Sequence, residues 1–396
     1  MKRPFGLTAA IFGLFTALGV SSTLFGLIIS EATTALGISL VAAGLVTTLF
    51  AVGRIVGSFV GGPLTDRAGG AWVTAAGTAT MLLGLAGLGA APWASVFFLG
   101  SFVMGAGFGA LDVALNTDIS ALHPQRRGSM LSLLHGFYGV GSFVGPLLIG
   151  LVIAWTGSWR AAPGLVALLF VGAGLWYRAF TDRAERAGSA AGEGKPAPLR
   201  VGLLTLLQQP AFLLIVPVGF IYQGVSWSLS LWLPTFMAQV HGAAPLQAAS
   251  AVSILWGGLT VGRFVNSAVI RVLGDGNALL LGAGGSFFAL TLGLVAPRPS
   301  LLLVALFVTG LALSTLIPTS ISVLTRLWPE TAGTVSGVFM TISAAGVLFF
   351  PWFQGVLAEL WGMRAGLGTG ILALLLLVVI VAALRRLLRT EARAVA

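Results

Sequence analysis

The chain has 396 residues, of which 57% are hydrophobic and only 8% charged, with a formal net charge of +10 and no cysteine. A soluble domain carries roughly 25% charged residues, so this composition excludes a soluble globular fold and makes lipid the solvent for most of the chain. The lack of cysteine excludes disulfides, thiolate nucleophiles and cysteine metal sites.

The apolar stretches predict the secondary structure in chain order, because a spanning helix needs about 20 mostly apolar residues. We expect an all-α membrane protein. Its predicted spans are 8–30, 40–62, 72–91, 96–119, 130–154, 161–180, 209–239, 247–270, 277–296, 300–325, 334–358 and 367–388. The first stretch is too long for a signal peptide and is expected to remain as the first span.

A polar stretch divides these spans six and six. Residues 181–208 begin TDRAERAGSAAGEGKPAPLR, which mixes both charge signs with Gly, Pro, Ala and Ser and is typical of a flexible linker. We therefore expect an N-terminal six-helix bundle at 1–180, a cytoplasmic linker at 181–208 and a C-terminal six-helix bundle at 209–396.

The basic residues predict the orientation. If the N-terminus is cytoplasmic, sixteen Lys and Arg residues fall inside and only Arg160, Arg298 and Arg364 fall outside. Arginine in short inner loops orients membrane proteins and does not indicate nucleic-acid binding. We expect a multi-pass protein of the bacterial inner (plasma) membrane with both termini cytoplasmic.

Two internal repeats indicate related halves. GRIVGSFVGGPLTD at 53–66 matches GRFVNSAVIRVLGD at 262–275 at seven of fourteen positions, an offset of 209 that pairs Arg54 with Arg263. A second, weaker match pairs Gly141 with Gly346 and Pro146 with Pro351, an offset of 205. Two related halves with a site between them are a common build of secondary transporters.

The loop after the second span reads GPLTDRAG at 62–69. It resembles the signature loop of the major facilitator superfamily, although Gly70 and Ala71 replace the basic pair that ends the signature. The resemblance implies two six-helix bundles related by pseudo-twofold symmetry. It also implies that Gly62, Asp66, Arg67 and Gly69 form a conformational latch, in which Asp66 helps to hold the halves in the outward-open state.

Three further runs resemble the fucose permease branch of sugar–proton symporters within that superfamily: GFGALDVALN at 107–116, LHGFYGVG at 134–141 and WGGLTVGR at 256–263. Ser226 stands where many relatives have a glutamate, and the first span lacks the family's carboxylate. The resemblance implies uptake of a sugar or polyol by alternating access.

Ionisable residues inside spans are costly and are usually functional. Asp112 and His135 lie at similar depth on consecutive spans, so we predict Asp112 as the proton-coupling group and His135 as its partner or relay. Asp118 is expected to be structural, paired with Arg126 or Arg127. A structural hydrogen-bonded pair is the alternative for Asp112 and His135.

Arg54 and Arg263 are predicted to be buried cations, either as substrate ligands or, as we favour, as a structural lock on the cytoplasmic side. Pyranose rings present an apolar face and a polar rim. We therefore predict a substrate site near the midplane, and the residue types that suit it are Asn116, Tyr138, Tyr222, Gln223, Trp227 and Trp256.

Other classes of membrane protein fit less well. No Walker A motif is present, which argues against an ATP-driven pump, and no nucleophile–base or metal-ligand spacing indicates an enzyme. We expect no catalytic residue, cofactor or metal, and a monomer in lipid that binds a small solute and protons. Proton-driven export of amphipathic compounds or drugs remains the alternative to sugar uptake.

Overall fold

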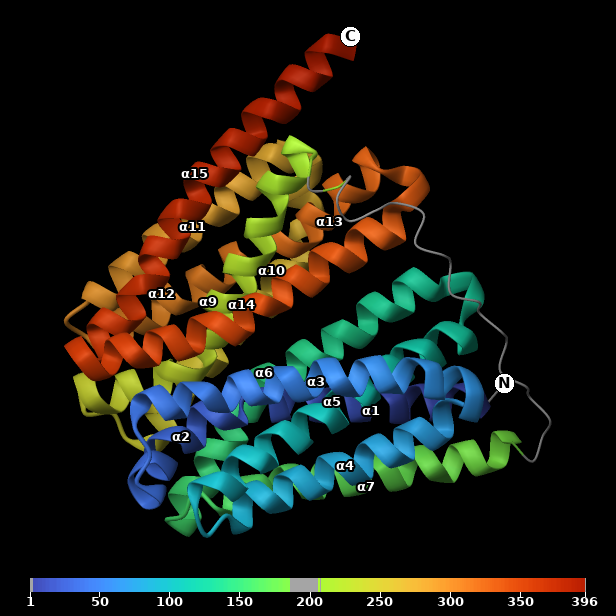
Figure 1. Ribbon diagram of the computed structural model, residues 1–396, viewed down its shortest axis with the longest axis vertical. Helices are drawn as coiled ribbons and strands as arrows, with labels where there is room; N and C mark the ends of the chain where they lie inside the picture. The colour runs from blue at the N-terminus through green and yellow to red at the C-terminus, as the bar shows by residue number, and fades with distance from the viewer. Residues whose placement is uncertain (1–2, 186–205, 207, 396) are drawn as a thin grey trace. The chain divides into compact units, whose positions relative to one another are not determined.

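The computed structural model describes residues 3–185, 206 and 208–395, and in these ranges the chain is helical without strands (Figure 1). The first half holds α1 (Arg3–Ser22), α2 (Leu24–Leu36), α3 (Leu40–Ala68), α4 (Gly70–Ala90), α5 (Ala94–Leu122), the short 3-10 helix η1 (Pro124–Arg126), α6 (Arg127–Thr156) and α7 (Ala161–Glu185). The second half holds α9 (Pro210–His241), α10 (Pro245–Leu273), α11 (Asp275–Val295), α12 (Pro299–Leu313), α13 (Leu316–Leu327), η2 (Pro329–Thr331), α14 (Ala332–Trp361) and α15 (Met363–Val395).

Twelve segments in the described ranges are long and apolar enough to cross a membrane. Each coincides with one of the twelve stretches predicted from the sequence. Two of them are built from two helices each: α1 with α2 makes the span Phe5–Leu36, and α12 with α13 makes Pro299–Leu327. The prediction of an all-α protein with twelve spans is confirmed.

Hydroxyl side chains mark the interruption between α1 and α2. The side chains of Ser21, Ser22 and Thr23 donate to the carbonyl oxygens of Leu18, Gly19 and Val20, each three residues back along the chain. Such bonds compete with the regular helical ladder and bend helices. Ser314 and Thr315 make the same bonds between α12 and α13. These interruptions were not predicted, because hydropathy is unchanged across them.

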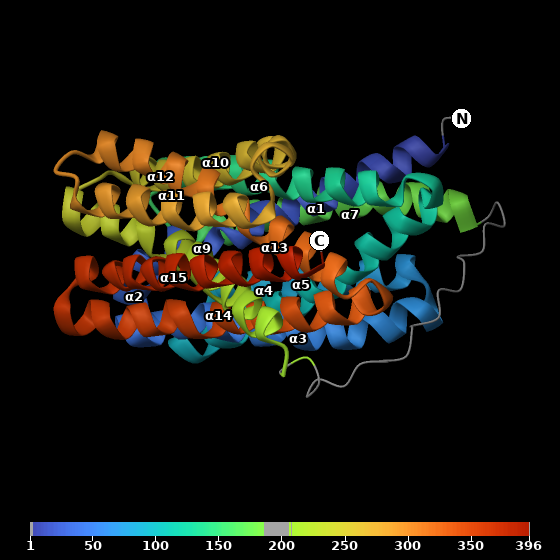
Figure 2. The same ribbon diagram turned by 90° about the horizontal axis from the view of Figure 1, so that it is seen from above.

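The chain divides into two compact units, the first comprising 1–196 with 244–249 and the second 197–243 with 250–396. In the first unit α3 and α4 pack on α5, and α6 and α7 pack on α1 (Figure 2). In the second unit α14 and α15 pack on α9, and α12 and α15 pack on α11. The division falls inside the expected linker 181–208, of which residues 186–205 and 207 lie outside the described residues; 181–185 continue α7.

Glycines bring α3 and α5 of the first unit into backbone contact. A Cβ added to Gly53 would overlap the carbonyl oxygen of Phe102, and one added to Gly105 would overlap that of Phe50. A Cβ on Gly109 would overlap the carbonyl oxygen of Arg54. Small residues permit such close approach in membrane helices, where packing rather than hydrophobicity joins them. The contact fixes which side chains of α3 face which side chains of α5.

The two units share their local geometry at an offset of 205. A Cβ added to Gly258 would overlap the carbonyl oxygen of Phe307, and one added to Gly310 would overlap that of Leu255. These are the equivalents, 205 residues on, of the contacts made by Gly53 and Gly105 in the first unit. The glycines with positive φ in the described chain also pair at 205, as Gly37 with Gly242, Gly69 with Gly274, and Gly157 with Gly362. The duplicated unit is therefore visible in the backbone of both halves.

This register corrects the stronger of the two sequence repeats. At an offset of 205, Arg54 corresponds to Leu259 and Arg263 to Ser58, so the two arginines are not structural equivalents. The offset of 209 is longer by four residues, which is about one helical turn of 3.6 residues. A slip of one turn preserves the helix face, and for that reason the sequence match could favour the wrong register.

Candidate functional site

A charged cluster lies between α3 and α5 of the first unit. The Arg54 Nη2 atom donates to Asp112 Oδ2 across 2.8 Å, and the two side chains are 35% and 22% exposed. Asn116 Nδ2, one turn along α5, donates to Asp112 Oδ1 across 2.9 Å. Both carboxylate oxygens of Asp112 are therefore engaged. The glycine contact described above places Arg54 opposite Asp112, so the helix packing and the ion pair depend on the same surface.

Aromatic rings extend this cluster to α1 and α6. The Arg54 guanidinium carbon lies 4.8 Å from the Phe108 ring centroid, and Phe108 lies 6.4 Å from the ring of Tyr138 on α6. Phe15 on α1 packs edge-on against both Tyr138 and His135. A cation over an aromatic face gains roughly 0.5–2 kcal/mol, depending on its desolvation. Four helices of the first unit thus contribute to one site.

The structure adds a partner to the pair expected within this site. Asp112 forms an ion pair with Arg54, and the ring of His135 lies 5.2 Å from that of Phe15. The partnership of Asp112 with His135 stays a prediction. His135 is exposed on α6. The pattern that could have revealed the Arg54–Asp112 pair was the glycine series on both helices, which implies that they pack closely at this level.

A second group of predicted residues lies in the second unit. Trp256 Nε1 on α10 donates to Ser230 Oγ on α9 across 3.0 Å, which fixes the plane of the indole. Tyr222, Trp227 and Trp256 are buried, at 6%, 5% and 5% exposure, while Gln223 on α9 is half-buried. An interfacial belt or lipid contact would leave these tryptophans exposed, so their burial favours a role inside the protein.

Unused hydrogen-bonding groups occur on the same helices as these aromatic residues. Among the hydroxyl groups of the second unit that are buried without a hydrogen-bond partner in the described part of the chain are those of Ser226, Ser228 and Thr235 on α9 and Ser253 on α10. Both amide atoms of Gln354 on α14 are also buried without a partner there. Buried polar groups normally have partners, so a cluster of unused ones indicates room for water or a polar ligand. The sequence singled out only Ser226, because serine, threonine and glutamine are unremarkable in spans.

The residues of the predicted latch lie at the end of α3. Asp66 and Arg67 are exposed in its last turn, and the backbone N–H of Gly69 donates to the carbonyl oxygen of Thr65 to close the helix. Gly62 is half-buried, and a Cβ added there would meet no atom within 4 Å. The four residues are available at the surface of their helix end, and their role as a latch stays a prediction.

Both units hold a carboxylate at the N-terminus of an equivalent helix. In the first unit Asp118 of α5 lies against Gly70, the first residue of α4, and accepts a hydrogen bond from the Tyr177 hydroxyl. In the second unit the residue equivalent to Gly70 is Asp275, which Arg326 of α13 contacts at 2.6 Å. An acid is favourable there because helix N-termini carry partial positive charge. Asp118 is thus held by Tyr177, not by Arg126 or Arg127, which are both exposed.

Arg263 differs from Arg54 in its surroundings. It is half-buried on α10, and no carboxylate pairs with it among the side chains that the structure describes. Arg54 is also half-buried, but its charge has a defined anion in Asp112. Arg263 remains a candidate lock or substrate ligand.

Comparison with known proteins identifies the family. The model of the Major Facilitator Superfamily matches residues 10–297, more than half of the chain. The chain belongs to the major facilitator superfamily. Its twelve candidate spans agree with a multi-pass membrane protein. A crystal structure of the nucleoside transporter NupG shares the fold, with a TM-score of 0.81 at 13% identity over 97% of this chain and 100% of that one.

Two relatives differ in the solutes that their names give. A glucose/galactose transporter of Brucella abortus biovar 1 (strain 9-941) is 27% identical over 287 residues, or 67% of this chain and 66% of that protein. The chain thus spans just under two thirds of that relative's length. A chloramphenicol resistance protein of Streptomyces lividans is 28% identical over 340 residues, 82% of each chain. These comparisons establish the family of the chain but do not identify its solute.

Proposed function

We propose that this transporter takes up a sugar or polyol by proton-coupled alternating access. The observation that carries the proposal is the Arg54–Asp112 pair, because an ionisable carboxylate inside a membrane span costs several kcal/mol unless paired and marks proton or substrate pathways. Asp112 is 22% exposed and is therefore not sealed inside the first unit. His135, exposed on the neighbouring α6, is the candidate relay.

The chemistry of coupling follows from the pair. When Asp112 is ionised, its charge is balanced by Arg54, and α3 is tied to α5. When Asp112 takes up a proton, it becomes neutral, and Arg54 loses its anion. The guanidinium then needs another acceptor, such as a substrate hydroxyl or water. Proton uptake and substrate binding are thereby linked through one cation, whose forked donors suit sugar hydroxyl groups.

Sugar as the solute is supported by the residue types and by the relatives. The aromatic faces of Tyr222, Trp227 and Trp256 suit the apolar side of a pyranose. The unpartnered hydroxyl groups on the same two helices, α9 and α10, offer hydrogen bonds for its rim. Asn116, Tyr138 and Gln223 complete the proposed set. The glucose/galactose transporter among the relatives is consistent with this solute class.

Orientation and gating are part of the proposal. The excess of Lys and Arg on one side supports an orientation in a bacterial inner membrane with both termini and the linker in the cytoplasm. We propose that the cytoplasmic latch consists of Gly62, Asp66, Arg67 and Gly69, because Asp66 and Arg67 are exposed at the end of α3. We propose that the protein works as a monomer.

Export of amphipathic compounds is the second candidate. The observation that favours it is the chloramphenicol resistance protein, which matches more of this chain than the sugar transporter does. Aromatic, glycine-rich spans suit such compounds as well. A proton-coupling Asp112 would serve either direction of transport.

The two candidates separate in a ligand-stabilisation experiment. A ligand that binds only the folded state stabilises it by RT ln(1 + [L]/Kd), so a ligand at a hundred times its Kd adds about 2.7 kcal/mol. The purified chain is heated with D-glucose, D-galactose, D-xylose and mannitol, and separately with chloramphenicol and tetraphenylphosphonium. Sugar uptake predicts a stereoselective rise in the unfolding temperature with a sugar. A response to the amphipathic compounds alone would replace the sugar proposal with the export proposal.

A further inference from the structure

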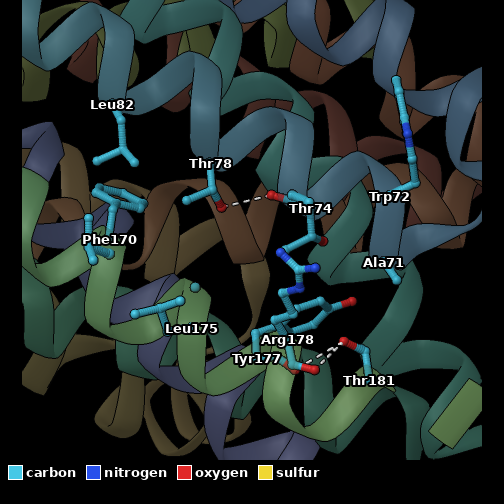
Figure 3. Close-up of a pocket in the computed structure, with 13 residues that line it drawn as sticks. Ala71, Trp72, Thr74, Thr78, Leu82, Phe170, Leu175, Tyr177, Arg178 and Thr181 are labelled. Atoms are coloured by element: carbon cyan, nitrogen blue, oxygen red, sulfur yellow. Dashed lines mark hydrogen bonds between the residues drawn. The ribbon is translucent and has the colours of Figure 1, made fainter. Parts of the chain in front are cut away.

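A cavity of about 400 Å³ lies between α4 and α7, and none of its lining residues belongs to the Arg54–Asp112 cluster (Figure 3). Its wall includes Trp72, Thr74 and Thr78 from α4 and Phe170, Leu175 and Arg178 from α7. Gly174 lets the helices approach, because a Cβ added there would lie 3.2 Å from the Thr78 methyl group. The cavity is thus a feature of how this helix pair packs.

The cavity has a polar end and an apolar end. Figure 3 shows Thr74, Arg178 and Thr181 gathered at one end and Leu82 with Phe170 at the other. Trp72 and Leu82 are ten residues apart on α4, which is about 15 Å at the helical rise. That length is about half the thickness of the hydrocarbon layer, roughly 30 Å, and therefore matches one leaflet of a bilayer.

Two observations at the polar end point to a ligand. Thr74 is 1% exposed, and its hydroxyl has no hydrogen-bond partner among the described residues, although it lines the cavity. Arg178 supplies a positive charge to the same end. The Asp118 carboxylate accepts a hydrogen bond from the hydroxyl of Tyr177, which also lines the cavity. A buried donor beside a guanidinium is suited to a phosphate oxygen.

Side chains of α7 at the apolar end are exposed on the surface of the first unit. Leu175 is 64% exposed and Val171 39% exposed on α7, within a segment that crosses the membrane. Lipid chains cover such side chains in a bilayer. Trp72, 55% exposed at the polar end, is the residue type that favours the level of the headgroups.

We propose that a glycerophospholipid occupies this cavity. Its phosphate is held by the Arg178 guanidinium and the Thr74 hydroxyl, and one acyl chain lies along Phe170 and Leu82. With the orientation proposed above, the lipid belongs to the cytoplasmic leaflet. It braces α4 against α7 and is separate from the transported solute.

The proposal is tested by native mass spectrometry of the full-length protein in maltoside detergent. The protein is titrated with dioleoyl phosphatidylglycerol or with dioleoylglycerol, which has the same chains without the phosphate. We expect retention of the phospholipid and little of the diacylglycerol. Arg178→Gln should weaken retention about tenfold, because charge-assisted phosphate bonds are the strong ones. Thr74→Val should weaken it severalfold without disturbing an existing side-chain hydrogen bond.

Matched variants separate the site from general lipid binding. Ala75→Trp places an indole in the cavity and should abolish retention, whereas Ala79→Trp, one turn along α4 and outside the lining, should not. Arg127→Gln removes an exposed arginine elsewhere and should leave retention unchanged. Equal retention of diacylglycerol, equal effects of Arg178→Gln and Arg127→Gln, or displacement of the phospholipid by millimolar inorganic phosphate would each overturn the proposal.

Discussion

Arg54 and Asp112 form an ion pair of 2.8 Å between α3 and α5, at the level where the backbones of the two helices touch. The pair joins the packing of the first unit to its chemistry. Gly109 precedes Asp112 by three residues and contacts the carbonyl of Arg54, so any movement of α3 along α5 changes the ion pair as well. A change in the charge of Asp112 can therefore alter how the two helices pack.

Removing one charge of this pair should cost more than removing both. Arg54→Gln leaves the Asp112 carboxylate with Asn116 alone, and we expect a loss of about 1–2 kcal/mol in unfolding free energy, tempered by the partial exposure of both groups. Arg54→Gln combined with Asp112→Asn should recover part of that loss, giving a coupling energy of about 0.5–3 kcal/mol in a double-mutant cycle. Thermal unfolding in detergent measures it. Strictly additive effects would show that the pair has no energetic role.

The glycine contacts predict which substitutions disturb the packing. Gly53→Ala and Gly258→Ala each place a methyl group against a carbonyl oxygen of the facing helix, and each should cost about 1–3 kcal/mol by overpacking. Gly172→Ala on α7, where an added Cβ meets nothing within 4 Å, is the matched control and should be neutral. The unfolding temperatures of the three variants measure these differences in stability. Equal behaviour of Gly172→Ala and Gly53→Ala would contradict the close contact.

The equivalence of Gly70 and Asp275 predicts a rescue. Gly70→Asp alone should destabilise the first unit, because its side chain would collide with the Asp118 carboxylate and add a like charge. Gly70→Asp with Asp118→Val removes the collision and the like charge, because Val323, the residue equivalent to Asp118, lies beside Asp275 in the register of the second unit. The double variant should recover much of the lost unfolding temperature. A double variant no more stable than Gly70→Asp would argue against the register of 205.

The indole of Trp256 predicts a change in substrate affinity. Trp256→Phe keeps an aromatic face but removes the donor that orients it on Ser230. We expect KM for the transported solute to rise severalfold with a smaller change in the maximal rate, because positioning in the bound state is lost. Uptake by proteoliposomes measures both constants. The exposed Trp361 serves as control through Trp361→Phe, and equal effects of the two would remove Trp256 from the binding site.

The sequence predicted the spans well because hydropathy decides them. All twelve predicted stretches are helices, but most of their ends lie further out, as with α3, which continues to Ala68. The interruption at Thr23 was missed because serine and threonine bend a helix without changing its hydropathy. The sequence match aligned the two halves at an offset of 209, one helical turn away from the structural offset of 205. Small and aliphatic residues recur at each turn along a helix face, so a shift of one turn still aligns many identical residues.

The structure adds one contact to the candidate site that the sequence did not predict, the ion pair between Arg54 and Asp112. One cluster contains Asp112, Asn116 and Arg54. The sequence did not predict that Arg54 pairs with Asp112, because the two residues are 58 positions apart in the chain. Only the packing of α3 on α5 brings them together. The cavity between α4 and α7 had no signal in the sequence, because threonine and arginine at a span end are common.

The most direct test of the account is the Asp112→Asn variant in proteoliposomes, with the solute that stabilises the wild-type protein. The amide that replaces the carboxylate cannot carry a proton, but its oxygen can still accept a hydrogen bond from Arg54. We predict that the variant exchanges labelled for unlabelled solute across the membrane but no longer accumulates it under a proton gradient. Asp118→Asn, a carboxylate substitution on the same helix, should still accumulate. Accumulation by Asp112→Asn at the wild-type level would contradict proton coupling at Asp112.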